Sequence, residues 1–134
     1  MTQTLDPLTF QTDHHTDLWI ADRVMGWPTI REGEPLAHYL GHGGVIVVDR
    51  PNIFRFGTIS EGFMPSSRIE DAFEVMRKMK ELGWTCVIHA DPAEKTTVVM
   101  FSKGEYEDYF ASAELESLAI CRAAGLVIVG KHDN

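Results

Sequence analysis

Histidines are the residues whose type and spacing most directly suggest chemistry in this sequence. His38 and His42 are four positions apart, so on a helix they would share one face, as paired zinc ligands do. His89 lies near the end of a β-rich run and could supply a third ligand. The glycine at position 41 and the absence of an HExxH motif favour an ordinary loop pair instead. A small metal-assisted hydrolase built on these three histidines and nearby carboxylates therefore stays an alternative, and no cofactor is otherwise predicted.

A segment that mixes acidic and aromatic residues is the second candidate. It reads EYEDYF from Glu105 to Phe110. Aromatic anchors within negative charge are typical of a surface that binds a basic partner. The predicted partner-binding residues are Glu105, Tyr106, Glu107, Asp108 and Tyr109. The competing interpretation is that Tyr109 and Phe110 pack under the last helix.

The remaining motifs indicate structure rather than chemistry. Cys86 and Cys121 lie inside apolar segments without metal-type spacing, which predicts two buried, reduced thiols. The glycines of residues 41–44 precede a strand instead of opening a helix, so a dinucleotide-binding loop does not fit. Binding of a small nucleotide signal stays a further alternative, although the sequence shows no Arg/Lys cluster for it.

Composition limits the classes of protein that remain. The chain has 134 residues, which is the size of one domain, and its 12 Lys and Arg against 20 Asp and Glu give a net charge of −8. Direct nucleic-acid binding is therefore not expected, because it relies on clustered cations. The polar start and the absence of an apolar run of about 20 residues predict no secretory signal and no membrane span. We expect a cytoplasmic protein.

The first half of the chain predicts one helix and one hairpin. Residues 1–15 are expected to form a flexible N-terminal arm, and residues 16–134 a single domain. A helix should begin with Thr16 as its N-cap and end at Gly26. Residues 27–44 are rich in Gly and Pro, and the β-rich residues 45–48 and 53–59 then predict a β-hairpin.

The second half predicts two helices around another hairpin. Ser67 and Glu70 have the spacing of a capping box, which predicts a helix that ends at Gly83. Its expected apolar face consists of Ile69, Phe73, Met76, Met79 and Leu82. Residues 84–90 and 96–102 predict an antiparallel hairpin, residues 103–109 a polar loop, and residues 113–124 the last helix. Residues 125–130 fit a helix extension or a closing strand, and Gly125 and the β-branched residues favour the strand.

The predicted fold class is α+β: an antiparallel sheet of two hairpins covered by helices, similar to an α-β-α sandwich. Three blocks of the sequence also resemble a known protein family. They are LWIADRVMGW at 18–27, FMPSSRIEDAFEVM at 63–76 and LAICRAA at 118–124. Together they resemble the small bacteriophage and prophage proteins grouped as the phage α-β-α sandwich domain. The resemblance implies a sandwich fold and a phage or prophage origin, and it carries no functional residue to this chain.

These observations lead to a functional prediction. We expect a small phage-type accessory protein that acts by stoichiometric binding through an acidic surface, as a homo-oligomer. The expected partner is a host protein with a basic nucleic-acid-binding groove, such as a defence or nucleic-acid-processing protein, which the protein would inhibit. The charge of −8 favours this partner because complementary potentials speed encounter with a basic groove.

Overall fold

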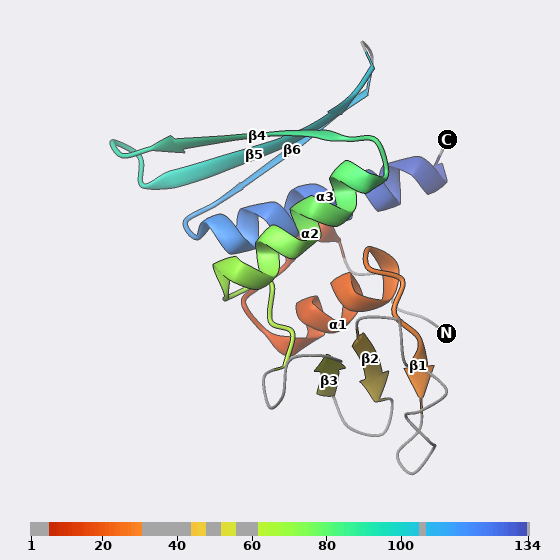
Figure 1. Ribbon diagram of the computed structural model, residues 1–134. Helices are drawn as coiled ribbons and strands as arrows, with labels where there is room; N and C mark the ends of the chain where they lie inside the picture. Colours follow the sequence, from red (N-terminus) through yellow and green to blue (C-terminus); the bar gives the residue numbers. More distant parts are fainter. Residues whose placement is uncertain (1–5, 31–43, 48–51, 56–61, 105–106, 134) are drawn as a thin grey trace.

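A computed structural model shows an α+β fold with one continuous hydrophobic core, as the sequence predicts. It describes residues 6–30, 44–47, 52–55, 62–104 and 107–133. In this part of the chain, helices lie between two three-stranded sheets (Figure 1). The elements are η1 (Pro7–Thr9), α1 (His14–Arg23), β1 (Thr29–Ile30), β2 (Gly44–Val47), β3 (Asn52–Arg55), α2 (Ile69–Glu81), β4 (Thr85–Asp91), β5 (Thr96–Lys103), β6 (Glu107–Ala113) and α3 (Glu116–Asp133).

The two predicted hairpins are present, but they belong to different sheets. The strands β2 and β3 pair antiparallel, and the short β1 joins them in parallel to β2. The strands β4, β5 and β6 form a fully antiparallel sheet at the other side of the helices. Residues 107–109, which were predicted as loop, are the start of β6. Acidic residues are uncommon in strands, so the sequence did not indicate this strand. Packing of β6 against α3 stabilises it.

Residues 125–130 are helical and belong to α3, so the helix extension is the correct one of the two alternatives. β-Branched residues had suggested a strand, but this helix is buried on most sides, so packing decides its structure. Gly125 has a packing role here, since an added Cβ would lie 2.8 Å from side-chain atoms of Pro7 and Phe10. The last helix is therefore longer than predicted because an N-terminal segment packs closely against it.

Residues 6–15 of the predicted N-terminal arm pack against the helices, and residues 1–5 lie outside the described residues. Pro7 and Phe10 are buried, and the Arg122 guanidinium on α3 donates two hydrogen bonds to the Phe10 carbonyl, at 3.0 and 2.7 Å. The N-cap of α1 is Asp13 rather than Thr16, and its carboxylate accepts the Thr16 N–H at 2.9 Å. The folded unit thus includes residues that precede position 16.

The start of α2 also differs from the prediction. Its N-cap is Arg68, without a side-chain capping bond, so the capping box of Ser67 and Glu70 does not form. Gly83 follows the end of this helix with φ +98°, as expected for a glycine stop. The predicted apolar face is only partly right. Phe73 is 44% exposed, whereas the buried residues of the helix are Asp71, Ala72, Val75 and Met79.

In the described residues, no helix is both long and apolar enough to cross a membrane.

Candidate functional site

The outward face of the sheet β4–β6 carries an exposed apolar row. Strand register places Val87, Met100 and Phe110 side by side across the three strands. Val87 is 53% exposed and Phe110 is 65% exposed, with the half-buried Met100 between them. Asp108 lies in the adjacent row on the same face, beside Ser102 and Thr85. We call these six residues, together with His89, Val98 and Ser112, the outward sheet face.

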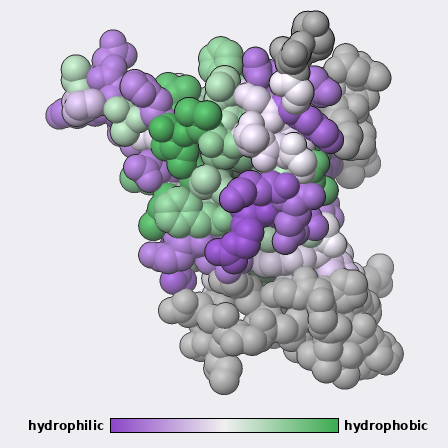
Figure 2. Space-filling model, turned by 45° about the horizontal axis from the view of Figure 1, so that its top comes forward, coloured by the Kyte–Doolittle hydropathy of each residue, from purple (hydrophilic) through white to green (hydrophobic). Residues whose placement is uncertain are grey.

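Strand alternation explains why these side chains point outward. Successive side chains of a strand point to opposite faces, and the intervening Val99, Phe101 and Ala111 are buried against the helices. In Figure 1 the helices cover one face of this sheet, and the other face is free of described elements. Figure 2 looks obliquely onto that side and shows hydrophobic surface between hydrophilic ends. Exposed aromatic and aliphatic side chains grouped in this way are typical of a protein-binding surface.

The predicted acidic and aromatic residues divide between the two faces of β6. Glu105 and Tyr106 lie outside the described residues, whereas Glu107 and Asp108 are exposed at the start of the strand. Tyr109 points to the helix layer, where its ring meets that of Trp84 at 5.8 Å between centroids. Phe110 points outward. The interpretation that both aromatics pack under the last helix is therefore right for Tyr109 and wrong for Phe110, which is 65% exposed.

The close packing of Tyr109 has a structural cause. A Cβ added at Gly130 of α3 would lie 2.5 Å from a carbon atom of the Tyr109 ring. The absence of a side chain at Gly130 thus makes room for this aromatic ring under the sheet. Tyr109 consequently positions β6 on α3, and Phe110 is the exposed aromatic residue of this strand.

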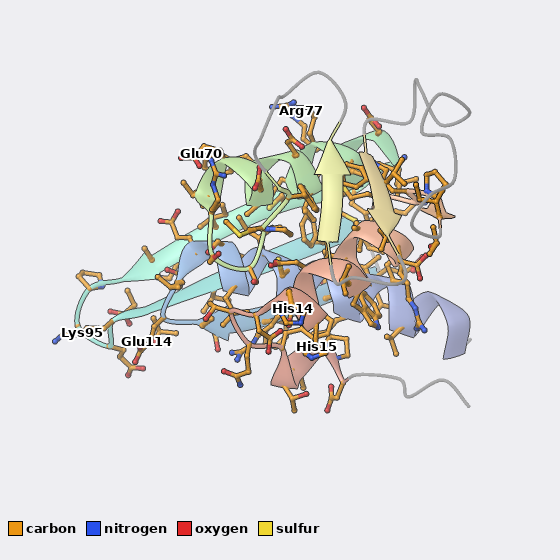
Figure 3. All side chains as sticks on the ribbon, turned by 90° about the horizontal axis from the view of Figure 1, so that it is seen from below. His14, His15, Glu70, Arg77, Lys95 and Glu114 are labelled. Atoms are coloured by element: carbon orange, nitrogen blue, oxygen red, sulfur yellow. The ribbon has the colours of Figure 1, made fainter. Side chains whose placement is uncertain are left out.

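The predicted metal ligands are not brought together in the part of the chain that the structure describes. His38 and His42 lie outside it, and His89 is exposed on β4. Among the described residues, no three His, Cys, Asp or Glu side chains could hold a metal ion together. The adjacent His14 and His15 at the start of α1 have their rings 4.5 Å apart (Figure 3), and both are exposed.

A second polar region is buried where α1, α3 and the turn before α2 meet. The Asp17 carboxylate accepts the Ser66 N–H at 2.9 Å, and the Ser117 hydroxyl donates to the Ser66 carbonyl at 3.0 Å. The Asp71 carboxylate accepts the Met64 N–H at 2.8 Å. All four polar side chains involved are at least nine-tenths buried. We call Asp17, Ser66, Ser117 and Asp71 the buried polar junction.

Burial changes the ionisation of groups at this junction. It raises the pKa of Asp17 to about 6, against the lowering effect of the bonds from Ser66. The carboxylates of Asp13 and Asp71 raise it further. Burial, with a smaller effect of Asp17, also raises the pKa of the Cys121 thiol well above its usual value. This cysteine is therefore an unreactive buried thiol, as predicted.

An open pocket of about 330 Å³ adjoins the junction. Asp13, His14, Asp17 and Ser67 contribute its polar wall, and Phe63 contributes to its apolar wall. These carboxylates already accept backbone N–H groups of a helix start or of the turn, so the junction is explained by the fold. One feature of the sequence indicates the buried polar junction: Asp17 lies four residues before Ala21, so both residues share the buried side of α1.

Comparisons with known proteins identify the fold family. The model of the phage ABA sandwich domain matches residues 18–125, so the chain belongs to this family. The crystal structure of a phage protein from Bacillus cereus is similar, with a TM-score of 0.54 over 93% of this chain and 94% of that one. The two sequences are 18% identical, so this likeness concerns the fold alone. No curated protein matches the sequence.

The three sequence blocks that resemble the family are structural in this chain. The first forms α1 and its exit, the second forms the turn and α2, and the third lies in α3 and contains Arg122. Asp17 immediately precedes the first block, Ser66 and Asp71 belong to the second, and Ser117 immediately precedes the third. The blocks therefore coincide with the contacts among the helices, whereas the outward sheet face lies between them in sequence.

Proposed function

We propose that this member of the phage ABA sandwich family is an accessory protein that acts by stoichiometric binding of a host protein through the outward sheet face. The observation that supports this proposal best is the exposed row of Val87, Met100 and Phe110 beside an acidic strand start. Grouped apolar side chains on the surface of a charged protein are typical of a site that a partner covers.

The chemistry of β6 favours a basic partner. Glu107 and Asp108 begin the strand, and its sequence, EDYFASA, contains no Lys or Arg. Lys103, the cross-strand neighbour of Glu107, donates to the Leu82 carbonyl at 3.3 Å and lies over the Trp84 ring. The negative charge at this end of the sheet is thus available to cations of a partner, which accelerate association and select among partners.

The arrangement matches the anatomy of a specific interface. Large aromatic side chains near the centre supply most of the binding energy, and charged residues at the rim add specificity and speed. Phe110 would fill a pocket of the partner, with Asp108 at the rim of the same face. Blocking a functional basic groove in this way would inhibit a defence or nucleic-acid-processing protein without any catalytic step.

An affinity capture from host lysate tests the proposal with matched variants. We expect wild-type protein to retain a partner at a fixed stoichiometry, and Phe110→Ala to lose it. Phe73→Ala removes a comparably exposed phenylalanine from α2, so it should retain the partner. Asp108→Lys should weaken capture, whereas Glu81→Lys, on the exposed side of α2, should not.

Two further measurements distinguish this function from its competitors. Light scattering reports whether a second copy of the chain covers the face; a dimer that Phe110→Ala dissociates would replace the host partner as the occupant. Metal analysis of untagged protein tests the hydrolase alternative. Stoichiometric zinc or manganese that is lost in His42→Ala would contradict a purely binding function.

A further inference from the structure

We infer that the partner adds an extended segment to the free edge of β6 as a fourth strand, with basic and apolar side chains in alternation. This inference rests on the proposed function and states how the partner is held. Main-chain hydrogen bonds supply affinity in this mode of recognition, and alternate side chains supply specificity.

The edge of β6 directs polar backbone groups away from the sheet. In the described residues, β5 is the only strand that pairs with β6. Residues of an antiparallel strand alternately direct their N–H and C=O groups toward the partner strand and away from it. The Ser112 carbonyl accepts a hydrogen bond from Arg122 Nη1 at 2.9 Å, which marks it as directed away from β5. By alternation, Asp108 and Phe110 direct their N–H and C=O groups the same way.

The position of Arg122 limits where a strand can add. Its guanidinium joins the Ser112 carbonyl to that of Phe10, so the end of β6 near Ser112 is occupied by α3 and the N-terminal segment. The start of the strand, from Glu107 to Phe110, carries no such cover in the described residues, and three of its four residues are exposed. An added strand would therefore pair with this first half.

Side chains beside the edge determine the composition of the added segment. Asp108 and Phe110 point to the outward side, where a lysine or arginine would meet both a carboxylate and an aromatic ring. Tyr109 and Ala111 point to the helix layer, where apolar residues would continue the buried surface. The segment that fits is thus basic on one face and apolar on the other, which in a strand means strict alternation.

Other pairings fit less well. A second copy of β6 would bring two more carboxylates and no Lys or Arg to the same edge, which leaves the acidic residues without partners. The opposite edge of the sheet, β4, has the sequence TCVIHAD and lacks an acidic pair. The edge of β6 therefore differs from both in favouring a foreign, basic segment.

The experiment uses a capped heptapeptide of alternating lysine and valine as the probe, with the full-length ¹⁵N-labelled protein. We expect the peptide to shift the amide resonances of Asp108 and Phe110 more than those of Val87 and His89 on β4. Two N-methylated peptides then test the backbone pairing, one methylated at every valine and the other at every lysine. Only one of these two sets of N–H groups can face β6, so the two affinities should differ at least tenfold.

Each outcome has a defined meaning. Equal binding of both N-methylated peptides would overturn strand addition, and so would a peptide that fails to bind at all. A glutamate–valine peptide that binds as well as the lysine–valine peptide would overturn the basic alternation. Asp108→Lys should weaken the peptide complex at least tenfold, whereas Asp91→Lys on β4 should not. Loss of partner capture in Phe110→Ala does not depend on these peptides, so the proposed function can survive the failure of this inference.

Discussion

The buried polar junction and the outward sheet face invert the usual distribution of residues. At the junction, two carboxylates and two hydroxyls lie in the interior among three helices, and each is matched to a specific backbone group, the Ser66 hydroxyl to the Asp13 carbonyl at 3.4 Å. On the outward sheet face, a phenylalanine and a valine are more than half exposed, with no described element over them. The first region places polar groups inside, and the second places apolar groups outside.

The difference shows which region the fold explains. A buried polar group costs free energy unless it is hydrogen-bonded, so the partners at the junction account for its residues. They join the turn at 64–66 to α1, α3 and α2, which fixes how the helices meet. The exposed apolar row receives no comparable explanation from the residues that the structure describes. An unexplained feature of the surface, rather than a satisfied one of the core, is where we expect a partner to bind.

The largest expected effect is a loss of stability in Phe63→Ala. Phe63 is fully buried beside the junction, with its ring 4.6 Å from that of Trp27. Removal of this ring should lower the free energy of unfolding by about 3–5 kcal/mol, because a cavity remains in the core. Chemical denaturation measures the effect. A loss below about 1 kcal/mol would mean that the interior beside the buried polar junction is loosely packed. The junction and the outward sheet face would then differ less in packing.

Arg122→Met should have the next largest effect. The guanidinium bonds the carbonyls of Phe10 and Ser112, and methionine keeps much of the aliphatic stem but none of the donors. We expect a loss of about 2–3 kcal/mol, since hydrogen bonds from charged groups are stronger than neutral ones. Hydrogen exchange at residues 8–12 should accelerate in the same variant.

A matched substitution on α2 serves as its control. Arg77 is exposed (Figure 3), and Arg77→Met should change the free energy of unfolding by less than about 0.5 kcal/mol. If the two variants were equally stable, the N-terminal segment would not depend on Arg122. Arg122 also covers the end of β6 near Ser112. If hydrogen exchange at residues 8–12 were unchanged in Arg122→Met, there would be no reason to limit an added strand to the first half of β6.

The junction should also make stability depend on pH through Asp17. Its pKa is about 6 in the folded protein, above the ordinary aspartate value of 3.8. The folded state therefore binds the proton more tightly than the unfolded state, and this contribution to stability is fully present below about pH 3.8. It is lost as the pH rises through about 6. The difference corresponds to about 3 kcal/mol, which partial solvent screening reduces to about 1–2 kcal/mol.

Asp17→Asn isolates that contribution. The amide oxygen can still accept the Ser66 N–H, but the side chain no longer ionises. At pH 7 the variant should exceed the wild type in stability by about 1–2 kcal/mol, and this advantage should shrink toward pH 4. Urea denaturation at a series of pH values measures it. A variant that is less stable than the wild type at pH 7 but not at pH 4 would show that the charge itself supports the junction.

The sequence predicted the local features better than those that depend on distant contacts. Hairpins and the glycine stop of α2 follow from neighbouring residues, and they are confirmed. The start of α2 was misplaced because contacts that are distant in sequence hold the turn before it: Ser66 bonds Asp17 of α1 and Ser117 of α3, 49 and 51 residues away. The helix then begins after Arg68, and the predicted capping box of Ser67 and Glu70 does not form. Residues 125–130 could not be assigned either, since helix burial, rather than β propensity, determines them.

The candidate site shows the same limit. The acidic residues at the start of β6 were recognised from composition, but the inward and outward positions of Tyr109 and Phe110 depend on strand phase. That phase is determined by packing on Trp84 and Gly130, which are far away in the sequence. A shift of one residue in register would exchange the two aromatics. Composition therefore singled out this segment as a candidate, and only the fold identifies which of its described aromatic residues is exposed.

Apart from the control at Arg77, the smallest effect on stability, and the most informative one, is expected for Phe110→Ala. Its side chain is 65% exposed, so the free energy of unfolding should fall by at most about 1 kcal/mol, mainly through reduced strand propensity. The same change at Phe63 is expected to cost several times more, although both remove one phenyl ring. If Phe110→Ala proved as destabilising as Phe63→Ala, the ring would be buried in solution, either in this chain or under a second copy of it. Light scattering would separate these two cases, because only a self-associating protein would dissociate on substitution. A stable, monomeric variant that no longer retains its partner would instead mean that this phenylalanine is kept for binding alone.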